Sequence, residues 1–202
     1  APGDAKALRA MAGLAGILGR CAEALELMRK AIALDPLSAR AHRQAALLYY
    51  QADRLDDTAA AFQLALDLSP SAGLSHAFLA ITRVLQGRAA EALALATVES
   101  HDVFRNMAFS LIHHTLGNAS ESDAALKALI DGFGWTAAFQ VAEVHAYRGE
   151  DDKAYEWLEA AYAQRDPGLQ NLATDLLLVP LHGDPRWLPF LKRMGFASSA
   201  AP

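Results

Sequence analysis

The chain has 202 residues, of which 53% are hydrophobic and 20% charged, and its formal net charge is −5. This composition supplies enough apolar material for a folded core and excludes an intrinsically disordered chain. The mild acidity argues against nucleic acid as a partner, and a lone cysteine, Cys21, excludes an intrachain disulfide.

The sequence carries no obvious targeting or membrane segment. Its apolar runs are far shorter than the roughly 20 residues that cross a bilayer, so we expect no membrane partner. The first ten residues lack the layout of a signal peptide, which favours a cytoplasmic protein, or a periplasmic one if an upstream signal was removed. The first residue is alanine, which suggests an excised part of a longer protein.

A short motif recurs along the chain at a nearly constant spacing. Its copies begin at Gly19, Asp53, Gly87, Gly117 and Gly149, so the intervals are 34, 34, 30 and 32 residues. A fixed period of this length is typical of a solenoid of helix pairs. The sequence therefore predicts an all-α array.

Apolar residues three or four positions apart predict two helices in each copy. Gly19 ends the first helix, because glycine readily adopts the left-handed conformation that terminates helices. In that helix the expected buried stripe contains Leu8, Met11, Ala12, Ala15 and Leu18. The ten expected helices span residues 4–18, 21–34, 38–52, 55–68, 72–86, 88–98, 103–116, 119–131, 135–148 and 151–164.

The repeats end near Asp166. A short helix, an apolar segment and a last helix with Asp184 as its N-cap are expected to follow. Because an open solenoid exposes the apolar face of its last repeat, we expect residues 168–196 to form a helical cap over that face. Residues 197–202 are expected to be a disordered tail.

The repeats resemble the tetratricopeptide repeat (TPR). In that family small residues let the two helices of a pair approach closely, and a proline closes the unit, as Pro36 and Pro70 do here. The matching small residues of the first helices are Ala12, Ala46, Ala80, Ser110 and Ala142. Those of the second helices are Ala24, Ala31, Ala65, Ala92, Ala154 and Ala161.

The resemblance implies an all-α, right-handed superhelical solenoid of about five helix pairs with capping helices at its C-terminal end. The expected pairs fill residues 1–167 and span 5–36, 37–70, 71–102, 103–134 and 135–167. Two departures indicate divergent repeats: the family's tryptophan is missing, and Thr58 and Ser122 replace the usual alanine. The stretch from Ala163 to Phe196 is similar to the ends of TPR modules in bacterial signalling proteins with adenylate-cyclase-like, kinase or winged-helix domains.

In stacked pairs of this kind the first helices line a concave groove, which we expect to bind a protein or peptide. The groove is basic at its start and apolar in its middle, which suits an acidic or amphipathic segment. Alternatively, several of these residues belong to the core, because neighbouring repeats bury parts of each other. The candidate groove residues are Arg9, Arg40, Arg43, Gln44, Tyr50, Phe78, Met107, His114, Phe139, Glu143 and Tyr147.

No residue pattern indicates catalysis. No two of the seven histidines lie three or four residues apart, so the usual helical metal-binding pair is absent. Gly132 and Gly134 imitate part of a dinucleotide-binding motif, but a helix precedes them where that motif needs a strand. The sequence therefore predicts no catalytic residue, no metal and no cofactor.

Three hypotheses for the function remain open from the sequence. The first is a non-enzymatic scaffold that binds a peptide or protein segment. The second is a regulatory module of a longer signalling or transcription-regulating protein. The third is a small-molecule binder or enzyme with a pocket near His113, Trp135 and His145. The two ends of the array also allow a homodimer.

Overall fold

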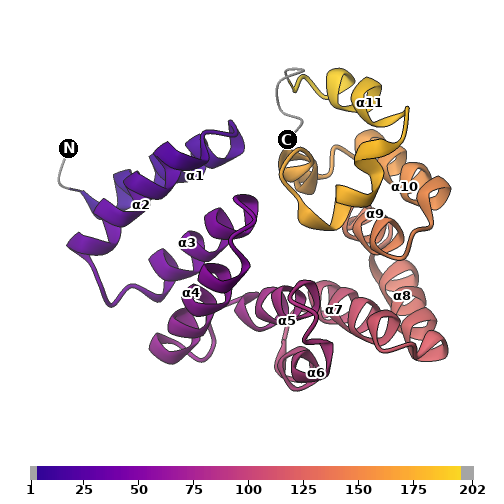
Figure 1. The fold of residues 1–202 in the computed structure, drawn as a ribbon, viewed down its shortest axis with the longest axis horizontal. Coiled ribbons are helices and arrows are strands. Elements are labelled where there is room, and N and C mark those ends of the chain that lie inside the picture. Colours follow the sequence, from indigo (N-terminus) through magenta and orange to yellow (C-terminus); the bar gives the residue numbers. More distant parts are fainter. Residues whose placement is uncertain (1–3, 197–202) are drawn as a thin grey trace. The chain divides into compact units, whose positions relative to one another are not determined.

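The structure is a computed structural model that describes residues 4–196 (Figure 1). The chain divides into two compact units, unit 1 (residues 1–101) and unit 2 (residues 102–202), and each is described by itself. Within residues 4–196 helices are the only regular secondary structure, so the predicted all-α fold is confirmed. The tail expected at 197–202 lies outside the described residues.

Unit 1 is a stack of three helix pairs. Each helix packs most closely on its partner in the pair, and the second helix of one pair packs on the first helix of the next. The helices are α1 (Ala5–Ile17), α2 (Cys21–Leu34), α3 (Ala39–Gln51), α4 (Leu55–Leu68), α5 (Ser75–Leu85) and α6 (Ala89–Val98).

Unit 2 contains two further helix pairs, and three shorter helical segments follow them. It comprises α7 (Asp102–Thr115), α8 (Ala119–Phe133), α9 (Ala138–Tyr147), α10 (Asp151–Gln164), the 3₁₀ helices η1 (Pro167–Asn171) and η2 (Leu176–Gly183), and α11 (Trp187–Arg193). The ten helices predicted for the repeats agree with these bounds to within three residues at each end.

Small side chains allow the helices of each pair to pack tightly. Every alanine or serine predicted at a helix crossing is 0% exposed, and so are Thr58 and Ser122, which replace alanine. Gly16 shows how close neighbouring pairs lie, because a Cβ atom there would come 2.6 Å from Cδ2 of Leu48 on α3. A larger side chain at such a position would force the helices apart.

The recurring motif marks the residue that turns the chain within a pair. Gly19, Gly87, Gly117 and Gly149 all have φ between +72° and +77°, and Asp53 occupies the same place with φ of +53°. Glycine adopts this left-handed conformation without steric cost, and aspartate tolerates it better than most residues. The period seen in the sequence is therefore a period of helix-to-helix turns.

Two buried carboxylates follow the second helices of later pairs: Glu99, where the closing proline is missing, and Asp166, which precedes Pro167. Glu99, which follows α6, accepts a hydrogen bond from the Ala77 amide in the first turn of α5 (3.1 Å). Asp166, which follows α10, accepts one from the Phe139 amide in the first turn of α9 (3.0 Å). Each carboxylate satisfies an amide that has no partner within its helix and lies at the positive end of that helix.

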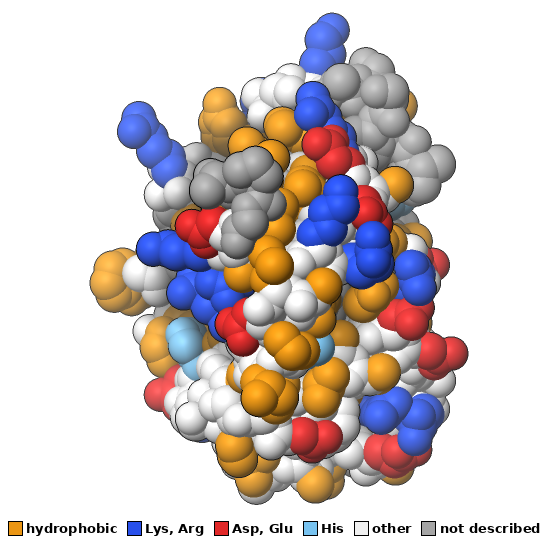
Figure 2. All heavy atoms as spheres, turned by 90° about the vertical axis from the view of Figure 1, so that its left-hand side faces the viewer, with side chains coloured by type: hydrophobic (Ala, Val, Ile, Leu, Met, Phe, Trp, Pro, Cys, Tyr) orange, Lys and Arg blue, Asp and Glu red, His pale blue; other side chains and the backbone are white. Residues whose placement is uncertain are grey.

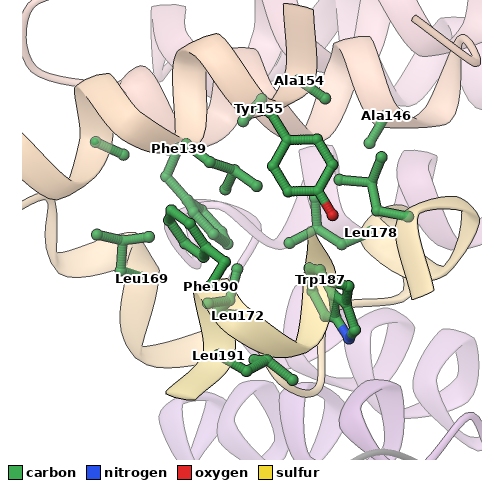
Figure 3. Close-up of a cluster of buried hydrophobic side chains, with 14 of the residues drawn as sticks. Phe139, Ala146, Ala154, Tyr155, Leu169, Leu172, Leu178, Trp187, Phe190 and Leu191 are labelled. Carbon is green, nitrogen blue, oxygen red and sulfur yellow. The ribbon is translucent and has the colours of Figure 1, made fainter. Parts of the chain in front are cut away.

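The segments after α10 pack against the last helix pair and form a buried hydrophobic core with it. Figure 3 shows Trp187 and Phe190 of α11 together with Phe139 of α9 and Tyr155 of α10, all in one buried cluster. The prediction of Asp184 as the N-cap of the last helix is wrong, because the N-cap of α11 is Arg186. The helix begins at Trp187, and Asp184 instead accepts a hydrogen bond from the Arg186 amide (2.8 Å) before the helix starts.

The expected stripe of α1 is only half correct. Leu8, Ala12 and Ala15 are buried, but Met11 and Leu18 are exposed. The reason is the position of α1 at the start of the array, where α2 and α3 cover only one side of the helix.

Candidate partner-binding surface

Three of the predicted arginines lie on neighbouring first helices of unit 1. Arg9 is on α1, and its Nη1 donates a hydrogen bond to Oγ of Ser38, the N-cap of α3 (3.1 Å). Gln44 of α3 donates in return to the Arg9 carbonyl (2.8 Å). These contacts hold the start of α1 beside the start of α3, where Arg40 and Arg43 are located.

The cations on these two helices have no anionic partner among the described residues. Lys6, Arg9, Arg40 and Arg43 form no salt bridge there, since neither α1 nor α3 contains an aspartate or glutamate. Arg43 is half-buried, and this burial, followed by the charge of Arg40, lowers the pKa of its guanidinium. Asp4, the N-cap of α1, interacts electrostatically with Lys6, so the positive charge without a neighbouring carboxylate belongs chiefly to Arg9, Arg40 and Arg43.

Cations on three of the second helices form ion pairs with acidic residues close in sequence. Arg29 of α2 pairs with Glu26 (2.9 Å), Lys127 of α8 pairs with Asp131 (2.5 Å), and Lys153 of α10 pairs with Glu150 (3.2 Å). Each pair lies three or four residues apart on one helix, the spacing at which side chains meet. Arg83, Arg165 and Lys192 likewise form no salt bridge with the described residues, so what distinguishes α1 and α3 is that four such cations lie on two neighbouring helices without acidic residues.

Figure 2 looks at the molecule from the side on which α1 to α4 lie in Figure 1. Hydrophobic side chains form a band on this face, with Lys and Arg side chains on both sides of the band. Arg40 is exposed, while Arg9, Arg43 and Gln44 are partly exposed, so all four are accessible to a partner.

The remaining predicted groove residues of unit 1 are less accessible. Tyr50 is buried in the core. Phe78 is half-buried and stacks on Phe62, with 5.9 Å between the ring centroids. The contact surface of unit 1 is therefore formed chiefly by charged and polar side chains at the starts of α1 and α3.

Most of the predicted groove residues of unit 2 belong to its core. Met107, Phe139 and Glu143 are at most 5% exposed, as the alternative interpretation of the sequence allowed, because the adjoining segments pack over them. His114 is exposed and packs edge to face with the half-buried Tyr147, whose hydroxyl lies 2.8 Å from Oγ1 of Thr115. Of the predicted groove residues in unit 2, only His114 and Tyr147 reach the surface.

Glu143 takes part in a buried acidic network that the sequence did not reveal. Its burial, then the negative charge and hydrogen bond of Asp175 and the charge of Asp166, raise the pKa of Glu143 well above its ordinary value. Asp175 also accepts a hydrogen bond from the Leu177 amide (2.9 Å). A protonated Glu143 can donate to Asp175, which ties α9 to the segments that cover it.

A surface hollow of about 810 Å³ lies along α10 and α11 in unit 2. Its lining includes Arg186 and Arg193, but both arginines already have acidic partners. Arg186 pairs with Asp152 (2.9 Å), and Arg193 pairs with Glu159 (2.7 Å). Unlike the α1 and α3 surface, this hollow neutralises its own cations.

The residues proposed for a small-molecule pocket have separate surroundings. His145 is buried, and its Nδ1 lies 2.6 Å from Oε2 of Glu150 across the turn between α9 and α10. His113 stacks on Phe109, and Trp135 is exposed. Among residues 4–196 no group of three or more His, Cys, Asp or Glu side chains is arranged to hold a metal ion.

Comparison with known proteins identifies the fold. No protein-family model matches the chain, and no curated protein matches it. The crystal structure of YrrB, described as a TPR protein with an unusual peptide-binding site, is similar with a TM-score of 0.55 and 22% sequence identity. The match covers 83% of this chain and 90% of that one. The chain therefore has a TPR-like helical-repeat fold.

The same comparisons leave the resemblance of residues 163–196 to signalling proteins as a prediction. In the described part of the chain no helix is long and apolar enough to span a membrane. The group of cations on α1 and α3 could have been found from the sequence, because the two helices contain four lysines and arginines and no acidic residue.

Proposed function

We propose that the chain is a non-catalytic binding module that holds an acidic or amphipathic segment of another protein on the starts of α1 and α3. The observation that carries this proposal is the group of four cations, Lys6, Arg9, Arg40 and Arg43, without a salt bridge among the described residues. A surface of this kind lowers the free energy of a bound carboxylate more than that of a neutral side chain.

The surroundings of Arg43 support a specific contact over a diffuse attraction. A half-buried guanidinium is less screened than one in bulk water, so a carboxylate that reaches it gains more electrostatic energy. Arginine also binds carboxylates through two parallel hydrogen bonds, which fixes the orientation of the ligand. The partly exposed Gln44 amide then provides a polar contact for the rest of the segment.

The structural neighbour is consistent with this proposal. YrrB is described as having a peptide-binding site, so a fold of this type holds peptides in at least that protein.

The proposal is tested with a short fluorescein-labelled peptide of glutamates interrupted by leucines. We expect it to bind the wild-type chain and to lose about tenfold or more in affinity with Arg40→Glu plus Arg43→Glu, because two attractive charges become repulsive. Binding should also weaken as salt is raised. Fluorescence anisotropy measures each affinity.

Two controls separate this surface from general charge effects. Arg29→Glu plus Lys30→Glu makes the same charge change on exposed residues of α2, and it should leave binding nearly unchanged. A peptide with glutamine in place of glutamate should bind weakly to every variant. Equal affinity of the wild type and the double variant would refute the proposed site.

A further inference from the structure

The outer face of α1 is apolar and exposed. Met11, Leu14 and Leu18 are 54%, 59% and 57% exposed, and their spacing of three and four residues places them on one side of the helix. Ile17 beside them is also exposed. A polar outer face is what a solenoid repeat presents where it meets water, and this apolar face differs from that pattern.

The repeat register shows what covers such a face elsewhere in unit 1. The positions 34 and 68 residues further along the chain lie on α3 and α5, and there they are buried by packing against α2 and α4, the second helices of the preceding pairs. The counterparts of Met11 are Ala45 and Leu79, and those of Leu14 are Leu48 and Thr82.

The face of α1 is also more apolar than its counterparts. Leu18 corresponds to Gln86 at the end of α5, where the side-chain amide donates to Asp56 at the start of α4 (2.7 Å). In α1 a leucine occupies the place of this polar link. The stripe is therefore suited to an apolar contact and not to solvent.

We propose that Met11, Leu14 and Leu18 form a docking site for one amphipathic helix of a partner, in the position that α2 takes on α3. Three or four half-exposed side chains offer on the order of a few hundred Å² of apolar surface. A stable protein dimer buries about 800 Å² on each partner. The area therefore fits a single helix and falls short of what a second copy of the chain would need.

The orientation of the docked helix follows from the contacts between the existing pairs. The bond from Gln86 to Asp56 joins the end of α5 to the start of α4, so a covering helix runs antiparallel to the helix that it covers. The last turns of the docked helix would then lie beside the start of α1, where Lys6 is exposed and forms no salt bridge with the described residues. Asp4 at the same helix start already interacts with Lys6, so the apolar stripe chiefly determines the occupant, and an acidic residue in those turns would add only a weak contact with the lysine.

The chain itself contains a helix with the required chemistry. The covering helix α4 buries Phe62 and Leu66 and carries the exposed Asp67 close to its end. A fluorescein-labelled peptide of residues 53–70 is therefore a defined probe for the site. We expect saturable binding to the full chain, with a Kd of about 10–500 μM measured by fluorescence anisotropy.

Variants locate the binding. Leu14→Lys plus Leu18→Lys should weaken binding at least about tenfold, and Lys6→Glu should weaken it a few-fold. Leu188→Lys changes an equally exposed leucine on α11 and should have no effect. The probe peptide is itself acidic, so Arg40→Glu plus Arg43→Glu is expected to weaken its binding through charge as well. Leu14→Ser plus Leu18→Ser should weaken the probe and leave binding of the glutamate and leucine peptide nearly unchanged, so this docking site and the proposed function can fail separately. If the lysine pair fails to fold by circular dichroism, Leu14→Ser plus Leu18→Ser is used instead.

Three results would overturn the proposal. The first is the absence of saturable binding up to about 1 mM peptide. The second is unchanged affinity in the double variant of Leu14 and Leu18. The third is a wild-type dimer in analytical ultracentrifugation that becomes monomeric in that variant, since a second copy would then be the occupant.

Discussion

The first and last helix pairs differ in how they end the array. On the first pair, the outer face of α1 is exposed and apolar. On the last pair, η1, η2 and α11 cover α9 and α10 and bury Trp187, Phe190 and Leu191 in one cluster. Within the described residues, the last pair is therefore covered by the segments that follow it, and the outer face of α1 is exposed.

The difference extends to the charged groups. In unit 1, Arg9, Arg40 and Arg43 form no salt bridge with the described residues, whereas unit 2 pairs Arg186 and Arg193 with acidic residues and places Glu143, Asp166 and Asp175 in its interior. In our interpretation the arginines of α1 and α3 in unit 1 are available to a partner, whereas the charged groups of unit 2 connect its own segments to one another.

The largest effect is expected from Trp187→Ala in the cover of the last pair. Trp187 is 1% exposed and packs among the side chains shown in Figure 3. Removing a buried tryptophan side chain leaves a cavity and should lower the free energy of unfolding by about 3–5 kcal/mol. Urea denaturation followed by circular dichroism measures this change.

A neighbouring residue is the control for this prediction. Leu188 lies next to Trp187 on α11 and is 56% exposed. Leu188→Ala should therefore change the free energy of unfolding by less than about 1 kcal/mol. Similar values for the two variants would mean that α11 does not cover the last pair.

A smaller, pH-dependent effect is expected from Glu143→Gln in the acidic interior of unit 2. The pKa of Glu143 is raised in the folded state relative to its ordinary value of 4.5. Below pH 4.5 the carboxyl is protonated in both states, so its contribution to stability is fully present there. As the pH rises toward the folded-state pKa, the unfolded state loses its proton first and stability falls.

The glutamine variant should therefore be more stable than the wild type near neutral pH, and the difference should disappear near pH 4. Thermal unfolding at several pH values measures it, and the Tm is expected to differ by a few degrees at pH 7. A variant that is less stable than the wild type at pH 7 would show that Glu143 is ionised and favourably paired there.

An effect of about 1 kcal/mol is expected at the crossing of α7 and α8. Oγ of Ser110 donates to the Ser122 carbonyl (3.0 Å), and Oγ of Ser122 donates to the Ser110 carbonyl (2.8 Å). Either single change to alanine should lower the free energy of unfolding by about 1 kcal/mol. The double change restores the alanine pair of other repeats and should cost less than the sum, which a double-mutant cycle detects.

The smallest effect is expected from Asp53→Gly in unit 1. Asp53 has φ of +53° where the other turns have glycine, so the substitution should stabilise the chain by about 0.5–1 kcal/mol. Gly87→Asp at the matching turn is the reciprocal control and should destabilise it. Unfolding by denaturant measures both, and a destabilising Asp53→Gly would indicate that the aspartate side chain contributes more than its backbone strain costs.

The fold was largely predictable from local sequence signals. Turn glycines such as Gly19 and small residues such as Ala24 act over a few residues, so the helix pairs and their bounds follow from the chain directly. The cover of the last pair was harder to place in detail. The start of α11 depends on how Trp187 packs into a cluster formed by distant segments.

The candidate site was predictable only in part. Arg40 and Arg43 were identified because of their charge, and the lack of acidic residues on their helix makes them stand out. Met107 and Phe139 were not separable from surface residues, because their burial depends on packing between neighbouring pairs. The exposure of Met11 likewise depends on which side of α1 lacks a neighbour.

The most direct test of the account is a map of backbone amide chemical shifts in the isotopically labelled chain as the glutamate and leucine peptide is added. The account predicts that the largest changes occur at the starts of α1 and α3, around Arg9, Arg40 and Arg43, and that they disappear with the glutamine peptide. Changes concentrated on α10 and α11, or on the second helices, would contradict it.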